Sequence, residues 1–196
     1  MRSAGIPIRW IKPGWNGFLD LVYPRDCLVT AQPVERESPY RNIGLAASER
    51  IIISRPPFCR TCGYPFWGAA DSENPCPHCI ELEPVFGQGR TAALMDGPAR
   101  RLIIELKYHR GLYVIPDLVT MAGRVPGFLD YLRGAILVPV PLHFSRLQTR
   151  GFNQSEKIAC ALSREIEGTR VCRLLKRVVN TETQTRLKRS DRERNV

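Results

Sequence analysis

Four cysteines in two closely spaced pairs are the residues of this sequence with the clearest chemistry. Cys59 and Cys62 form one C-x-x-C knuckle, Cys76 and Cys79 form a second, and 13 residues separate the two knuckles. Two facing knuckles supply four thiolates at about 2.3 Å from a tetrahedral zinc ion, and a closed set of four leaves no position for water. We therefore predict a structural zinc site, with His78 beside it as a spectator. The alternative is four free thiols or a redox pair.

A second candidate site is a basic, glycine-containing stretch that follows an apolar segment. It begins at Val138, continues through PVPLH, and leads into the first turn of an expected helix. Helix N-termini and converging arginines bind phosphate groups, and a glycine lets the backbone approach a ligand closely. In α/β sheets, ligands bind at the carboxyl ends of strands, where this loop would lie. The candidate anion-binding residues are Arg146, Arg150, Gly151, Phe152, Asn153 and Gln154. The alternative is a well-capped helix with two exposed arginines.

The charge of the chain also favours anionic partners. The 196 residues include 29 lysines and arginines against 19 aspartates and glutamates, a formal net charge of +10. Half of that excess lies in residues 173–196, which hold eight basic and three acidic side chains. Nucleic acid, phosphorylated small molecules or an acidic membrane surface would fit such a charge. A solvated basic tail is the alternative interpretation.

The composition excludes several classes of protein. With 43% hydrophobic residues the chain can bury a core, which excludes disorder throughout. No apolar run approaches the ~18 residues of a membrane span, and no signal-like run opens the chain, so we expect a cytoplasmic protein without membrane insertion. Cysteines stay reduced in that compartment. We therefore expect Cys27, Cys160 and Cys172 to be small buried residues rather than reactive thiols.

The helices that would position these sites follow from apolar periodicity and from glycine and proline. One helix is predicted to begin at Gly97-Pro98 and to stop near Gly111. A second is predicted over residues 116–132, with an interruption around Gly123 to Pro126. Strand material around a glycine turn is expected at 84–95, and a short amphipathic segment at 15–24.

The second candidate site would lie between a strand and a helix. Residues 135–138 are predicted to form a buried strand that ends at Pro139. Asn153 and Glu156 have the spacing of a capping box, and Gly168 is predicted to end the helix that they begin. The order helix, strand, helix indicates an α/β fold.

Together, the cysteine module and the VPVPLH…R…RGFNQ stretch resemble ComF-type proteins. These are phosphoribosyltransferase-like proteins linked to competence and DNA uptake in bacteria. The most specific match is Arg146 with Arg150 through Gln154. The other matching segments are Leu19-Asp20 through Pro24 with Cys27, Leu106-Lys107-Tyr108, and Thr183-Gln184-Thr185 with Leu187, Arg192, Arg194, Asn195 and Val196.

The resemblance implies an α/β fold with a type I phosphoribosyltransferase-like parallel sheet, preceded by a small four-cysteine zinc ribbon. Residues 1–83 would hold the N-terminal segment and the ribbon, and residues 84–196 the phosphoribosyltransferase-like domain. The implied activity is of the glycosyltransferase class, in DNA uptake or nucleotide metabolism. Loop 138–153 would lie on the pyrophosphate side of the site, and 180–196 would be a flexible hood. Arg146, Arg150 and the amides of 151–153 would stabilise the departing pyrophosphate.

The chain departs from the family pattern in two places. Thr30 stands where a further knuckle would have its second cysteine after Cys27, so a second zinc site is not expected. The family's acidic pair and its Thr/Gly-rich loop, which hold the ribose and 5-phosphate of phosphoribosyl pyrophosphate, have no counterpart in these 196 residues. We therefore expect a C-terminally truncated domain that does not turn over. Mg²⁺ with phosphoribosyl pyrophosphate would bind only with the missing part present.

A single-stranded DNA-binding accessory protein is the alternative function. The zinc ribbon and the basic C-terminal stretch would then contact DNA phosphates. The aromatic residues near the knuckles, Phe58, Tyr64, Phe66 and Trp67, would stack on bases or, in the simpler interpretation, pack against the zinc module. The partners expected are single-stranded DNA and competence or DNA-uptake proteins in this case, and a phosphoribosyl-type anionic ligand in the other.

Overall fold

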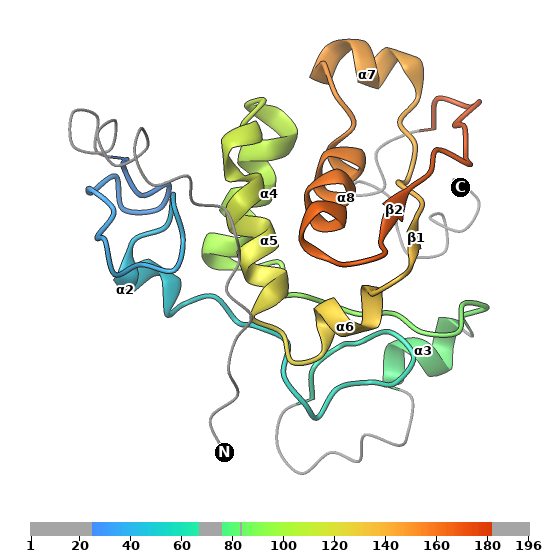
Figure 1. Ribbon diagram of the computed structural model, residues 1–196, viewed down its shortest axis with the longest axis horizontal. Helices are drawn as coiled ribbons and strands as arrows, with labels where there is room; N and C mark the ends of the chain where they lie inside the picture. The colour runs from blue at the N-terminus through green and yellow to red at the C-terminus, as the bar shows by residue number, and fades with distance from the viewer. Residues whose placement is uncertain (1–24, 67–75, 83, 182–196) are drawn as a thin grey trace.

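The computed structural model describes residues 25–66, 76–82 and 84–181, which have mixed α/β structure (Figure 1). Segments 15–24 and 183–196, together with Trp67, lie outside the described residues. Among the described helices none is suited to cross a bilayer, because α4 and α8, the longest, have 12 residues each against ~20 for a span. The elements in chain order are α2 (Leu45–Ser48), α3 (Pro77–Leu82), α4 (Gly97–Tyr108), the 3-10 helix η1 (Leu112–Val114), α5 (Ile115–Gly123), α6 (Phe128–Leu132), β1 (Ile136–Leu137), α7 (Phe144–Arg150), α8 (Gln154–Glu165) and β2 (Arg170–Val171).

Helix α4 begins and ends where its glycine and proline residues predict. The carboxylate of Asp96 accepts a hydrogen bond from the Gly97 N–H at 2.8 Å, and Pro98 occupies the first turn. Leu102 and Leu106 are almost fully buried on the inner face. The helix ends at Tyr108, three residues before Gly111. The sequence prediction for this helix is confirmed.

The predicted interruption of the next helical segment is also confirmed. Helix α5 ends at Gly123, and α6 begins at Phe128. Gly127 has a φ of 70°, a left-handed conformation that glycine adopts without a steric penalty. The chain turns there, so α6 leads into β1 (Figure 1).

Strands β1 and β2 pair in parallel, with Ile136 opposite Arg170 and Leu137 opposite Val171. Parallel strands need a crossover connection, and the segment containing α7 and α8 supplies it. Helix α8 contacts both β2 and α5, so it joins the strand pair to the helical part of the molecule (Figure 1). The pair forms a small parallel sheet.

The strand predicted at 135–138 is present, but the prediction that it is buried is wrong. Ile136 is 47% exposed and Val138 is 37% exposed. An apolar strand becomes buried when neighbouring strands and helices cover it. In the described part of the chain the sheet has two strands, so β1 has a strand neighbour on one edge alone.

Residues 144–150 form helix α7, where the sequence was expected to form a loop. The His143 side chain accepts a hydrogen bond from the Ser145 N–H and caps the first turn. Gly151, with a φ of 81°, ends the helix, and its N–H donates to the Leu147 carbonyl at 2.7 Å. Two local caps therefore make a helix of a stretch that its glycine and arginines had indicated to be a loop.

Two other local predictions are corrected. Residues 84–95 form one isolated antiparallel bridge, between Ala93 and Ile53, rather than a strand. Helix α8 ends at Glu165, and Gly168, with a φ of 71°, lies in the turn that follows. The first difference is one of element type, and the second is a helix end displaced by three residues, the same displacement as that of α4 from Gly111.

The main core joins the segment after residue 25 to α4 and α5. Cys27, Ile43, Val114 and Val119 are buried there, so the expectation for Cys27 is confirmed. The same expectation is wrong for Cys160 on α8 and for Cys172 after β2, which are partly buried. Cys172 directly follows β2, and its N–H donates to the Leu137 carbonyl at 3.0 Å.

Candidate metal centre and anion-binding cavity

The sulfur atoms of Cys59, Cys62, Cys76 and Cys79 all lie within 4.8 Å of one another. The Cys59 and Cys79 sulfurs are 3.8 Å apart, and those of Cys62 and Cys76 are 3.6 Å apart. A tetrahedral ion with bonds of about 2.3 Å to sulfur requires sulfurs separated by roughly 3.8 Å. The four cysteines predicted as ligands are therefore brought together in a geometry that could hold a metal.

Two different local structures present the two knuckles. The first lies in a tight hairpin, where the Cys59 N–H donates to the Tyr64 carbonyl at 2.8 Å and the Gly63 N–H donates to the Cys59 carbonyl at 2.9 Å. The second lies at the start of α3, where the Cys79 N–H donates to the Cys76 carbonyl at 2.8 Å. Each turn directs both of its sulfurs to one side, so the knuckles can face each other.

Gly63 is required at its position for two reasons. Its φ of +73° is in the left-handed region that residues with a Cβ rarely adopt. A Cβ placed there would lie 2.8 Å from both Arg90 Cα and Thr91 N. The first knuckle is therefore packed directly against the backbone of the segment that follows the second knuckle.

The electrostatics of the cluster favour a bound cation. Burial raises the pKa of the Cys59 thiol, but backbone N–H groups of Cys62, Cys76 and Thr61 outweigh it and lower that pKa to about 6. Burial raises the pKa of Cys62 and of Cys79, and at Cys79 the other three thiols add to the effect. Four thiolates in one place repel each other, and a divalent cation removes that repulsion.

The aromatic residues around the knuckles are engaged within the module. Phe66 packs against the cysteine cluster. The Tyr64 and His78 rings meet edge to face, with centroids 5.6 Å apart, so His78 lies beside the four-sulfur cluster and is not part of it. These contacts favour packing over base stacking for these rings.

Arg90 connects the cysteine module to α6. Its guanidinium lies 4.9 Å from the centroid of the Phe58 ring and 5.1 Å from that of Tyr131. The Tyr131 hydroxyl donates to the Gln88 carbonyl at 2.9 Å. A cation between two aromatic faces is attracted to both, so the module is held against the element that leads into β1.

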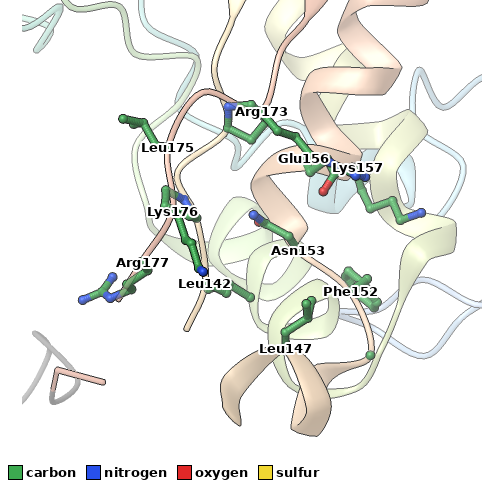
Figure 2. A pocket seen from close by; sticks show the side chains of 13 residues that line it. Leu142, Leu147, Phe152, Asn153, Glu156, Lys157, Arg173, Leu175, Lys176 and Arg177 are labelled. Carbon is green, nitrogen blue, oxygen red and sulfur yellow. Dashed lines mark hydrogen bonds and ion pairs between the residues drawn. The ribbon is translucent and has the colours of Figure 1, made fainter. Parts of the chain in front are cut away.

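A cavity of about 440 Å³ lies beyond the carboxyl ends of β1 and β2. One wall is the segment 173–177, and the facing wall is the first turn of α8, with Leu142 and Leu147 at the end near α7 (Figure 2). The lining residues are Pro139, Pro141, Leu142, Leu147, Gly151, Phe152, Asn153, Glu156, Lys157, Arg173, Leu175, Lys176 and Arg177. This is the region in which the sequence predicts an anion site.

The cavity is strongly basic. Lys157, Arg173, Lys176 and Arg177 line it, and among the lining residues that the structure describes Glu156 is the one acid. The Arg173 Nε donates to Glu156 Oε1 at 2.9 Å, and its Nη2 donates to the same oxygen. Four cations against one carboxylate, at the N-terminal end of a helix, give the cavity a field that attracts anions.

Asn153 fixes two walls of this cavity relative to each other. Its side-chain oxygen accepts from the Ser155 N–H at 3.0 Å and caps α8. Its side-chain nitrogen donates to the Val140 carbonyl at 2.9 Å. The cap that the sequence predicts at Asn153 is confirmed, and its amide also anchors the loop that leaves β1.

The structure brings half of the predicted anion-binding residues to this cavity. Gly151, Phe152 and Asn153 line it. Arg146 instead donates through Nη2 to the Thr181 carbonyl at 2.5 Å. Arg150 donates through Nη1 to Gln154 Oε1 at 3.1 Å. These two arginines and Gln154 are therefore outside the cavity lining, and they hold its surrounding segments together.

The segment Leu106-Lys107-Tyr108 lies against α7. The Arg150 guanidinium is 5.7 Å from the centroid of the Tyr108 ring, and Arg110 Nη2 donates to the Thr149 carbonyl at 3.1 Å. Burial, followed by the nearby charge of Arg150, lowers the pKa of Lys107. The end of α4 thus supports the helix that carries Arg146 and Arg150.

Sequence reasoning missed the cations that do line the cavity. Arg173, Lys176 and Arg177 were counted as members of a basic stretch without a location, and Lys157 was not singled out. The signal for Lys157 is its place in the first turn of a helix after a strand and a glycine. Arg173, Lys176 and Arg177 have no such local signal, because the pairing of β2 with β1 is what brings the segment after β2 to the cavity.

Comparisons with known proteins agree with the family-like motifs. The chain is 27% identical over 157 residues to Competence protein F of Haemophilus influenzae, across 78% of this chain and 67% of that protein. It is 29% identical over 154 residues to DNA utilization protein YhgH of Salmonella typhimurium, across 75% of this chain and 65% of that protein. The chain thus spans about two thirds of the length of each relative. No protein-family model and no solved structure matches it. The two relatives confirm the resemblance to the ComF-type, competence-associated proteins.

Proposed function

We propose that this chain is a zinc-stabilised, ComF-type protein that binds a phosphoribosyl-type polyanion in the cavity between segment 173–177 and α8, in a process linked to DNA uptake or nucleotide metabolism. The observation that carries the proposal is that Lys157, Arg173, Lys176 and Arg177 line the same cavity as Gly151, Phe152 and Asn153, at the carboxyl ends of two parallel strands. That location is where α/β proteins bind phosphorylated ligands. A type I phosphoribosyltransferase-like sheet and a domain boundary near residue 83 are part of the same proposal.

The residues of the cavity suit a ligand with a charged and an apolar part. Lys157, Lys176 and Arg177 would neutralise phosphate oxygens, and the N-terminal turn of α8 would add its positive end. Leu142, Leu147 and Phe152 offer an apolar floor of the kind that accepts a ring. The four cysteines would hold zinc in a closed site that stabilises the fold and takes no part in chemistry.

Calorimetric titration of the full chain with inorganic pyrophosphate tests the anion site. Lys176→Gln, within the cavity, should weaken pyrophosphate binding by roughly threefold to tenfold, because one charge-assisted contact is lost. Arg100→Gln, an exposed residue of α4 outside the lining, makes the same change of charge and should leave the affinity within about twofold. If both variants weakened pyrophosphate binding equally, the effect would come from net charge alone, and the proposed anion site would be contradicted.

Binding of single-stranded DNA is the second candidate function. The observation that favours it is the row of Arg173, Lys176 and Arg177 on one segment, with exposed Leu174, Val178 and Val179 between and after them. A strand of DNA held through its phosphates loses affinity steeply between low and moderate salt. Fluorescence anisotropy with a labelled single strand at several salt concentrations measures this salt dependence. Affinity that does not change with salt, or no binding, would reject the DNA-binding function.

A further inference from the structure

The carboxylate of Glu156 occupies a position in the cavity that suits a phosphate oxygen. The sequence spacing predicts that Glu156 completes a capping box with Asn153. In the structure its Oε1 instead accepts two hydrogen bonds from Arg173, through Nε and Nη2. Both side chains line the cavity (Figure 2).

The contact with Glu156 occupies the N–H groups of Arg173 that would otherwise bind an anion. A guanidinium binds phosphate through two N–H groups arranged as a fork. Arg173 directs such a pair, Nε and Nη2, at Glu156. Glu156 is also the third residue after the cap Asn153, in the turn of α8 where the helix favours negative charge. The Glu156 carboxylate therefore lies where both the Arg173 guanidinium and the N-terminal turn of α8 attract an anion.

The ion pair is weak enough to be displaced. The Arg173 side chain is 76% exposed, and that of Glu156 is 23% exposed. Ion pairs with so much contact with water contribute little to stability. A ligand with several negative charges would be attracted to all four cations that line the cavity, whereas Glu156 offers a single charge to a single partner.

We propose that Glu156 is an internal competitor in the cavity: it holds Arg173 when the cavity is empty, and a polyanionic phosphate ligand displaces it. This inference rests on the proposed anion site and adds to it a residue that sets ligand selectivity. Anions with one charge gain too little to replace Glu156, so the cavity discriminates in favour of pyrophosphate-like groups.

Calorimetric titration of the full chain with inorganic pyrophosphate tests this competition. Glu156→Gln keeps the size of the side chain and removes its charge, and it should tighten pyrophosphate binding by roughly threefold to fivefold, the equivalent of one exposed ion pair. Glu167→Gln is the matched control, because Glu167 has an 88% exposed side chain and lies outside the cavity lining. It should change the affinity by less than about 1.5-fold.

A double-mutant cycle separates competition from simple repulsion. If Glu156 acts by occupying Arg173, Glu156→Gln should have no effect on pyrophosphate affinity once Arg173 is replaced by glutamine. An effect of the same size in the Arg173→Gln background would show long-range repulsion and overturn the inference.

The remaining outcomes also decide between the two proposals. If the wild-type chain binds pyrophosphate and Glu156→Gln binds it equally or more weakly, the role of Glu156 as a competitor is rejected while the anion site stands. If neither chain binds pyrophosphate, both proposals fail. Matching thermal unfolding midpoints of the four variants show that each change acts on binding rather than on folding.

Discussion

Asn42 donates two hydrogen bonds to the carboxylate of Asp117, which lies 75 residues further along the chain. The backbone N–H and the side-chain amide of Asn42 reach Asp117 Oδ2 at 3.0 and 2.8 Å, and the Arg41 N–H reaches Oδ1 at 2.6 Å. Asp117 is fully buried in α5. One carboxylate therefore attaches the N-terminal segment to the helix that packs against α8.

Asp117→Ala should destabilise the protein by about 2–4 kcal/mol, because it removes the acceptor of the partly buried Arg41 N–H and of the buried Asn42 N–H. Urea unfolding followed by tryptophan fluorescence measures the loss. Asp130→Ala is the control, since Asp130 is an exposed carboxylate of α6 that pairs with Arg133, and it should cost less than about 1 kcal/mol. Equal losses for both would mean that the Asp117 contacts carry no special weight.

The stability of the chain should depend on Glu105 in a pH-dependent way. Burial opposes ionisation of Glu105, but hydrogen bonds from His109 at 2.9 Å and from the Tyr113 hydroxyl at 2.8 Å outweigh it and lower the Glu105 pKa below its ordinary 4.5. A lowered pKa in the folded state adds stability above pH 4.5 and loses it as the pH falls through the folded value.

The Glu105→Gln variant tests that dependence. At pH 7 the wild-type protein should unfold at a higher temperature than Glu105→Gln. The difference should shrink as the pH is lowered from about 4.5 toward 3. Circular dichroism melts of both chains at matched pH values give the difference directly, and metal loss in acid affects both alike. A difference that is constant over this range would contradict the assignment of the ionised form.

The four-sulfur cluster should bind about one zinc ion per chain after reconstitution. Cys76→Ser should reduce bound zinc to a small fraction of that, because a buried ligand is lost and three sulfurs remain. Cys172→Ser, which changes a partly buried cysteine outside the cluster, should retain the full amount. Mass spectrometry of the dialysed proteins measures the zinc bound per chain. Full zinc occupancy in the Cys76→Ser variant would rule out the cluster as the zinc site.

Replacement by alanine should have a large effect at one glycine near the module and a small effect at another. Gly63→Ala places a Cβ 2.8 Å from Arg90 Cα at a φ of +73°, and should cost about 2 kcal/mol or more. Among the described residues, the Cβ of Gly87→Ala would meet no atom within 4 Å, and the change should alter stability by less than about 1 kcal/mol in either direction. Thermal unfolding of both zinc-loaded variants is the measurement, and comparable midpoints would show that the backbone at residue 63 adapts.

Local sequence was sufficient for the features that local geometry controls. The C-x-x-C spacing predicted the four clustered sulfurs, because a tight turn places both sulfurs of one knuckle on the same side. Pro98 and Gly123 marked helix ends correctly, since the conformational limits of proline and glycine apply within one or two residues. Helix α7 was missed although its caps are also local, because His143 and Gly151 were read as parts of an anion-binding loop.

Burial and the cavity depended on contacts that the sequence does not display. The apolar run at 135–138 predicted a buried strand, and its exposure depends on how many strands lie beside it. Arg146 and Arg150 had the right residue type for anion binding, yet their side chains donate to Thr181 and Gln154. Residue type sets what a side chain can bind, and only its surroundings set what it does bind.

The sequence by itself therefore determined the four-cysteine cluster, the ends of α4 and α5, and the resemblance to ComF-type proteins. The tertiary structure decided which cations share a cavity. Because Leu137 pairs in parallel with Val171, the segments that follow β1 and β2 leave the sheet at the same edge. Residues 139–142 and 173–177 therefore run beside each other. That register is a contact between residues more than thirty positions apart, and no local pattern in either segment specifies it.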